Sequence, residues 1–247
     1  MNGSPVFQCC VTNTAAQAEG DFRETWLSFP ASPEDVQEAF RQVGLDGTRY
    51  REYLLSDFTS PLPGLRIGLS ETDTIDELNY LSKLIADMKP SERKVFEAVL
   101  EKGSFARTAE SHINLAINLE KFTLLAGIHD AVDYGMLLHE SDKQDYAGLI
   151  ERLAVSEDVG MQALALYIRT LETHFDAGSY GATMAEQEKG RFTCYGYLLG
   201  EPDLDQKYDG KSIPAEYMIT SYLAKKTARR SMRARVRTAV RIHRERV

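Results

Sequence analysis

The chain has 247 residues, 43% of them apolar, and a formal net charge of −8. This length allows one large domain or two to three small ones, and no apolar run approaches the roughly 20 residues that cross a membrane. The first residues, MNGSPVFQCC, lack the basic start and long apolar core of a secretory signal, so we expect a cytoplasmic protein without a membrane partner.

The charge is divided unevenly along the chain. The last 27 residues, Ser221–Val247, hold ten bases and one acid, a net of +9, which leaves −17 on residues 1–220. The sequence therefore predicts a strongly acidic body followed by a basic tail. Such a tail is either a disordered extension or a segment that contacts nucleic acid or another anionic surface.

The first predicted elements surround an acidic stretch. Val6–Asn13 and Glu24–Phe29 are typical of strands, and Pro30 ends the second because it has no N–H for a sheet ladder. A helix follows, with Ser32 as its N-cap and Gly44 at its C-terminal end. Apolar residues recur every three to four positions along this helix, so its carboxylates are left mostly on the outward face.

A third strand is predicted at Tyr50–Phe58, and three strands around one helix indicate a small α+β unit. Pro61, Pro63 and Gly64 then break the pattern, so a domain boundary is expected near residues 60–72.

The next stretch has helical periodicity. Thr74 and Glu77 form a capping-box pattern ahead of an apolar stripe that ends before Pro90. Further helices are predicted at Ser91–Lys102 and, shorter, at Ser104–His112, which together indicate a small helical bundle. Residues 113–119 fit two patterns: their apolar residues alternate as in a strand, whereas two asparagines have helical spacing, and the choice stays open.

The following region is again acidic. Asp130–Asp158 has a net charge of −6, with helical stretches near Ala131–His139 and Ala147–Leu153. Met161–His174 is predicted as a further helix, with an apolar stripe through Leu164, Ile168 and Leu171. A strand at Gly190–Gly200 and a turn with extended chain at Tyr208–Ile219 complete a second α+β unit.

A search for chemistry yields no site. The five histidines lack metal-ligand spacing, and there is neither a phosphate-binding glycine-rich loop nor a Gly-x-Ser-x-Gly elbow. The three cysteines, Cys9, Cys10 and Cys194, are best explained as buried small apolar residues. We therefore expect no catalytic residues, no metal and no cofactor, and a protein that is not an enzyme.

The segment Ser91–Leu119 has the outline of a helix-turn-helix, but its charge disfavours contact with DNA. Residues 91–133 carry five bases and seven acids, whereas phosphate neutralisation by bases supplies most of the affinity for a duplex. A negatively charged body fits the opposite role, in which the protein takes the place of the DNA. A body of net −17 matches the charge of about 29 Å of duplex, so carboxylates on rigid helices can imitate DNA in an enzyme's groove.

Several short motifs resemble, in their order and spacing, those of the ArdA-type antirestriction proteins of plasmids and conjugative transposons. They extend over residues 6–219 and are Thr12-Asn13 ahead of Glu19-Gly20, Trp26–Pro30, Gly44-Leu45, Tyr50–Asp57, Ile75–Asn79, Ile113–Leu115, Asp133–Gly135, Phe175–Gly181 and Gly190–Tyr197.

This resemblance implies a curved, elongated homodimer that imitates bent B-form DNA. Such a protein occupies the DNA-binding groove of type I restriction-modification enzymes, in their methyltransferase core, and blocks restriction and often methylation without any cofactor. It also implies an α+β chain of three small domains at residues 1–70, 71–135 and 136–220, with the basic tail at 221–247. The family's acidic antirestriction motif corresponds to either Leu137–Leu153 or the segment around Glu172–Glu188.

The predicted site is a distributed acidic surface in which each carboxylate replaces a phosphate. Its members are Glu19, Asp21, Glu24, Glu34, Asp35, Glu38, Glu71, Asp73, Asp76, Glu77, Asp87, Asp130, Asp133, Glu140, Asp142, Asp145, Glu151, Glu157 and Asp158. The alternative is a regulator that binds nucleic acid only through its basic tail and uses the acidic body as an interaction module.

Overall fold

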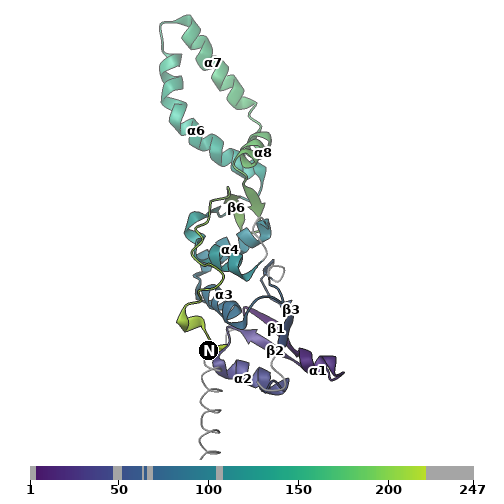
Figure 1. The fold of residues 1–247 in the computed structure, drawn as a ribbon. Helices are drawn as coiled ribbons and strands as arrows, with labels where there is room; N and C mark the ends of the chain where they lie inside the picture. Colours follow the sequence, from purple (N-terminus) through teal and green to yellow (C-terminus); the bar gives the residue numbers. More distant parts are fainter. Residues whose placement is uncertain (1–3, 47–51, 63, 66–68, 104–107, 221–247) are drawn as a thin grey trace, which may run out of the picture. The chain divides into compact units, whose positions relative to one another are not determined.

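The computed structural model describes residues 4–46, 52–62, 64–65, 69–103 and 108–220, which Figure 1 draws in colour. It is a mixed α+β structure with two antiparallel three-stranded sheets, which confirms the predicted class. Unit 1 holds the residues up to Leu119 and from Leu204 onward, and unit 2 runs from Glu120 to Asp203. The division into three small domains stays a prediction. None of the described helices is long and apolar enough to cross a membrane.

The first sheet of unit 1 has the strand order β2-β1-β3. Its strands, with the short helix that follows the first, are β1 (Phe7–Asn13), α1 (Thr14–Ala18), β2 (Glu24–Phe29) and β3 (Tyr53–Thr59). The first two predicted strands are confirmed to within one residue. The third begins at Tyr53 rather than Tyr50, and Tyr50 itself lies outside the described residues.

Helix α2 (Pro33–Gln42) has the predicted cap. The Ser32 hydroxyl accepts from the Asp35 N–H at 3.2 Å, and the Asp35 carboxylate accepts from the Ser32 N–H at 2.8 Å. Val36 and Ala39 are buried against the sheet, while the acidic side chains of the helix are exposed. The chain turns at Gly44 with φ of +73°, where a Cβ would also overlap the Arg23 guanidinium.

Three helices follow in unit 1, namely α3 (Ile75–Asp87), α4 (Pro90–Lys102) and α5 (Ala109–Ala116). The first two confirm the predicted helices, and Gly103 ends α4 in a left-handed conformation. The predicted helix at Ser104–His112 is wrong in its bounds: residues 104–107 lie outside the described structure, and the helix begins at Ala109.

For residues 113–119 the sequence fits both a strand and a helix, and the structure shows a helix. Helix α5 continues to Ala116, and a 3₁₀ turn comes next at Leu119–Lys121. The asparagines of this stretch bind the returning C-terminal segment. Asn114 exchanges two hydrogen bonds of 2.9 Å with the backbone of Tyr208, and Asn118 exchanges bonds of 3.0 and 3.3 Å with the backbone of Asp205. The helical spacing of the two asparagines therefore places both amides along one extended segment.

The predicted extended chain at Tyr208–Ile219 packs on α3 and contains a 3₁₀ turn at Ala215–Tyr217. Tyr80 stacks on Tyr217 at 4.4 Å and meets Tyr208 edge-on at 5.6 Å. The last described residues are held by Asp76, whose buried carboxylate accepts from the N–H groups of Ile219 and Thr220 at 2.7 and 2.8 Å.

Replacing Asp76 by alanine is expected to lower the free energy of unfolding by about 2 kcal/mol, because buried donors to a charged acceptor lose their partner. Urea unfolding of the full chain measures this loss. The matched control is Asp87→Ala on the same helix, an exposed site where a change within about 0.5 kcal/mol is expected. Equal behaviour of the two variants would contradict the anchoring role of Asp76.

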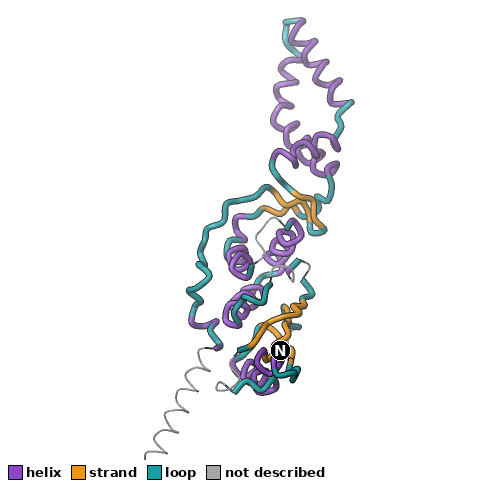
Figure 2. Tube along the Cα trace, turned by 45° about the vertical axis from the view of Figure 1, so that its right-hand side comes forward, coloured by secondary structure: helices purple, strands orange, loops and turns teal. Residues whose placement is uncertain are grey.

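Unit 2 combines a small sheet with three helices (Figures 1 and 2). The strands are β4 (Thr123–Leu125), β5 (Arg191–Thr193) and β6 (Gly196–Leu199), and they lie in the order β4-β6-β5. The helices are α6 (Ala131–Ala154), α7 (Val159–Thr173) and α8 (Ala177–Gln187). The two helical stretches predicted within residues 131–153 are one continuous helix. The single strand predicted at Gly190–Gly200 is instead a hairpin, and Gly196 turns the chain with φ of +133°.

The core of unit 2 contains a hydrogen-bonded tyrosine pair. The rings of Tyr134 and Tyr197 lie 4.1 Å apart, and both hydroxyls donate to the Glu188 carboxylate, at 2.6 and 3.1 Å. Burial, and then the bond to Glu188, raises the pKa of Tyr134 to about 12. Burial raises the pKa of Tyr197 as well.

Alkaline pH is expected to destabilise unit 2 through this pair. Because the folded pKa of Tyr134 lies above the ordinary value of 10, folding keeps a proton that the unfolded chain releases. Stability is then fully present below pH 10 and falls as the pH rises to 12. Urea unfolding across this range should show a shallower fall for Tyr134→Phe, and an unchanged slope in that variant would refute the assignment.

Candidate interaction surface

The structure places the predicted acidic residues in four different situations. Fifteen of the nineteen have exposed side chains, Asp73 and Glu77 are half-buried, Asp76 is buried, and the side chain of Asp145 lies outside the description. Asp76 is a correction, because a carboxylate that is 8% exposed and bonded to Ile219 and Thr220 cannot present its charge to a partner. The predicted role of the others as phosphate substitutes stays a prediction.

Several exposed carboxylates also hold helix ends. Asp130 and Asp158 accept hydrogen bonds from N–H groups in the first turns of α6 and α7, and Asp35 accepts from the N–H of Ser32, the N-cap of α2. Asp133 accepts from the His129 N–H at 3.2 Å. These positions are favourable because a helix N-terminus carries positive partial charge, so the acids stabilise the fold as well as adding surface charge.

Arginines in unit 1 partly neutralise two members of the surface. Asp21 pairs with Arg23, and Glu38 pairs with Arg41 one turn further along α2. The hydrogen bonds from Arg41, and then from Gln42, lower the pKa of Glu38 to about 2. Glu38 therefore stays ionised, and the arginines offset the charge of both carboxylates locally.

Six exposed members make no side-chain hydrogen bond or ion pair with any described residue. They are Glu34, Glu71, Asp87, Glu140, Glu151 and Glu157. No described hydrogen bond or ion pair therefore offsets the charge of these side chains.

Both units are acidic, but unit 2 is more densely charged. Residues 120–203 hold fifteen acids and six bases, a net of −9, and the rest of the acidic body carries −8 over a longer stretch. Helix α6 is about 36 Å long, at 1.5 Å per residue, and carries five acids. One strand of a duplex has a phosphate every 3.4 Å, so α6 alone has about half that density, and a mimic must combine several elements.

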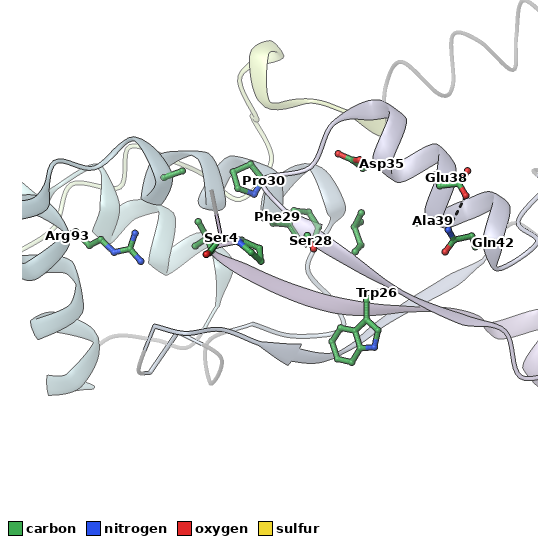
Figure 3. Close-up of a pocket in the computed structure, with 14 residues that line it drawn as sticks. Ser4, Trp26, Ser28, Phe29, Pro30, Asp35, Glu38, Ala39, Gln42 and Arg93 are labelled. Carbon is green, nitrogen blue, oxygen red and sulfur yellow. Dashed lines mark hydrogen bonds between the residues drawn. The ribbon is translucent and has the colours of Figure 1, made fainter. Parts of the chain in front are cut away.

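Unit 1 has a hollow of about 810 Å³ beside strand β2 (Figure 3). It is lined by Trp26 and Ser28 from β2, by Asp35, Glu38 and Gln42 from the α2 side, and by Arg93 from α4. Figure 3 shows Trp26 on one side of the β2 ribbon and the α2 side chains on the other, so the hollow follows the edge of the strand.

The described residues offer little for catalysis. Burial raises the pKa of the Cys9 thiol to about 12. Burial also raises the pKa of Cys10, so neither thiol forms a reactive thiolate near neutral pH. Within the same residues, no three His, Cys, Asp or Glu side chains are grouped to hold a metal ion. Cys194, which the sequence suggested was buried, is exposed.

Two exposed apolar features were not predicted as surface. Trp26 is 52% exposed. This exposure follows from the strand alternation, because Leu27 and Phe29 point inward and Trp26 therefore points outward. The apolar stripe of α7 is also largely exposed in the described structure: Leu164, Tyr167 and Leu171 are 45%, 60% and 52% exposed, and Ile168 of the predicted stripe is half-buried. Only the helical spacing of that stripe was visible in the sequence, and spacing does not tell a buried face from an exposed one.

Comparison with known proteins adds a family match. A model of the ArdA antirestriction proteins matches residues 9–199, which is more than three-quarters of the chain. A search of curated proteins finds no match. The matched range includes all of β1 to β6 except the first two residues of β1, and it ends before the basic tail.

Proposed function

The chain belongs to the ArdA family of antirestriction proteins, and we propose that it acts by imitating B-form DNA in the DNA-binding groove of type I restriction-modification enzymes. Antirestriction is the role of an inhibitor rather than of a catalyst. The target in this proposal is the methyltransferase core, whose groove binds duplex through basic residues, and occupation of the groove blocks restriction.

The observation that supports mimicry most directly is the set of exposed carboxylates on rigid elements of both units. Together the units carry −17 before the tail, a charge equal to that of about 29 Å of duplex. A basic groove that exchanges its bound counter-ions for these carboxylates gains the same ion-release entropy as when it binds DNA. Such binding needs neither cofactor nor turnover.

A displacement assay tests the proposal. A type I methyltransferase core is bound to labelled duplex and titrated with the full chain at low and at moderate salt, while methylation is followed in parallel. Displacement that weakens steeply with salt supports DNA mimicry. No displacement, or binding of the chain to the duplex itself, would favour the alternative in which the basic tail contacts nucleic acid.

We further propose that the working form is a homodimer joined through the exposed stripe of α7. Leu164, Tyr167 and Leu171 lie three to four residues apart, on one face of the helix. A dimer would bury this face and double the charge presented to the enzyme.

The double change Leu164→Glu and Leu171→Glu is expected to convert the dimer to a monomer, because four like charges would meet across the interface without water. Light scattering at several protein concentrations gives the mass. The matched control is Leu166→Glu, a 68% exposed position on the same helix outside the stripe, which should leave the mass unchanged. A wild-type chain that is monomeric throughout would contradict the dimer.

A further inference from the structure

Strand β2 has a neighbouring strand on one side only in the described part of the chain. Its pairing with β1 sets which backbone groups face the other side. The Asn13 N–H donates to the Arg23 carbonyl at 3.1 Å, which makes the facing residues Thr12 and Glu24 a non-hydrogen-bonded pair. Hydrogen-bonded and non-hydrogen-bonded pairs alternate along an antiparallel ladder, so Trp26 and Ser28, like Glu24, belong to non-hydrogen-bonded pairs. Their N–H and C=O groups therefore point away from β1, towards the free edge.

The hollow of Figure 3 lies along this edge and offers two different surfaces. On the α2 side it presents Asp35 and Glu38, with Glu34, which has no partner among the described residues, on the same helix. On the other side it presents the half-exposed Trp26 ring. Arg93 pairs with Glu97 at 3.0 Å, and Arg41 and Glu38 offset one another, so Glu34 and Asp35 carry the net negative charge of this side.

The chain leaves the described structure close to this hollow. Asn79 links the two places: its carbonyl oxygen accepts from the Ala31 N–H at 3.0 Å, and its amide donates to the Tyr217 carbonyl at 2.9 Å. Ala31 directly follows Pro30, which lines the hollow, and Thr220 is the last described residue. The 27 residues beyond Thr220, with a net charge of +9, therefore begin near an acidic face.

One stretch of that tail has the pattern of a strand. From Met232 to Arg237 the sequence is MRARVR, in which three arginines alternate with Met, Ala and Val. The intervening tail residues can span about 40 Å when extended, which is ample for the distance across one small sheet.

We propose that Met232–Arg237 of the same chain adds to the free edge of β2 as a further strand. Backbone hydrogen bonds to Trp26 and Ser28 hold the segment, as in other cases of strand addition. The arginines then face the carboxylates of α2, and the apolar side chains, Met232 among them, cover the Trp26 ring. This contact does not depend on the proposed function, although it would withdraw part of the acidic surface from a target.

Trp26 is the only tryptophan, so its fluorescence reports on the hollow alone. Quenching by acrylamide, a neutral quencher, is measured on the full chain at low salt and in 1 M salt, where the Debye length is about 3 Å. The quenching constant of the wild type should rise roughly two-fold with salt, because release of the strand uncovers the ring.

The test variant changes Arg233, Arg235 and Arg237 to Gln, outside the described fold. It should show the high quenching constant at both salt concentrations. The control changes Arg241, Arg244 and Arg246 to Gln and removes the same charge, but it should keep the wild-type behaviour. Equal quenching constants of the wild type and the test variant at low salt would overturn the proposal. It would also be overturned if the control had the same raised quenching constant at low salt as the test variant. Shielding that grows with protein concentration would assign the strand to a second copy and also overturn it.

Discussion

Changing together the six carboxylates that lack a partner among the described residues is expected to reduce displacement of duplex from the methyltransferase core by about 100-fold or more, whereas each single change should cost less than about five-fold. The six changes are Glu→Gln or Asp→Asn at Glu34, Glu71, Asp87, Glu140, Glu151 and Glu157. An exposed charge contributes about 0.2–1 kcal/mol to an ion pair, and 1.4 kcal/mol corresponds to a factor of ten in affinity. Single losses are therefore small, and only their sum is large.

The salt dependence supplies a second measurement on the same variant. If each carboxylate replaces a phosphate, each one lost should reduce the slope of log affinity against log salt by up to about 0.9. The six-site variant should therefore inhibit more weakly and also respond less to salt. An unchanged slope would mean that the carboxylates do not displace counter-ions in the groove.

The control for this variant exchanges Glu for Asp and Asp for Glu at the same six positions, so that every charge remains. It should inhibit like the wild type, because distributed electrostatic attraction depends weakly on side-chain length. None of the six side chains bonds to a described residue, so both variants should also unfold like the wild type. A single Glu→Gln change that ended inhibition would point to a discrete site instead.

Local signals explain which parts of the fold were predictable. The caps at Ser32 and Thr74 and the terminating Gly103 act within one helical turn. Helices α2 and α3 begin, and α4 ends, where these residues placed them. The contacts that such signals do not reveal are those with distant partners. Asn114 and Asn118 bind backbone about 90 residues away, and no local pattern in residues 113–119 reveals that.

The candidate surface shows the same division. Counting acids locates the charged segments, but it does not say which carboxylates are already committed. Asp76 looked equivalent to Asp73 and Asp87 until the return of Ile219 and Thr220 buried it. Likewise, the partners of Asp21 and Glu38 follow from side-chain geometry, although both arginines are near in sequence.

The second large effect is expected at the crossing of α6 and α8. A Cβ on Gly135 would overlap the Ala177 carbonyl oxygen, and a Cβ on Gly181 would overlap that of Ala131. The two helices thus meet backbone to backbone, and any side chain at either glycine must push them apart. Because backbone cannot give way as a flexible side chain does, Gly135→Ala and Gly181→Ala should each cost about 3 kcal/mol or more.

Gly148 on the same helix is the matched control, since a Cβ there meets nothing within 4 Å. Gly148→Ala should stabilise the chain by up to about 1 kcal/mol, because alanine loses less backbone entropy in a helix. Urea unfolding followed by helical circular dichroism compares the three variants. If Gly135→Ala unfolded like Gly148→Ala, the close crossing would be refuted. Since α6 carries Glu140 and Glu151, opening the crossing should weaken inhibition too, whereas Gly148→Ala should leave it intact.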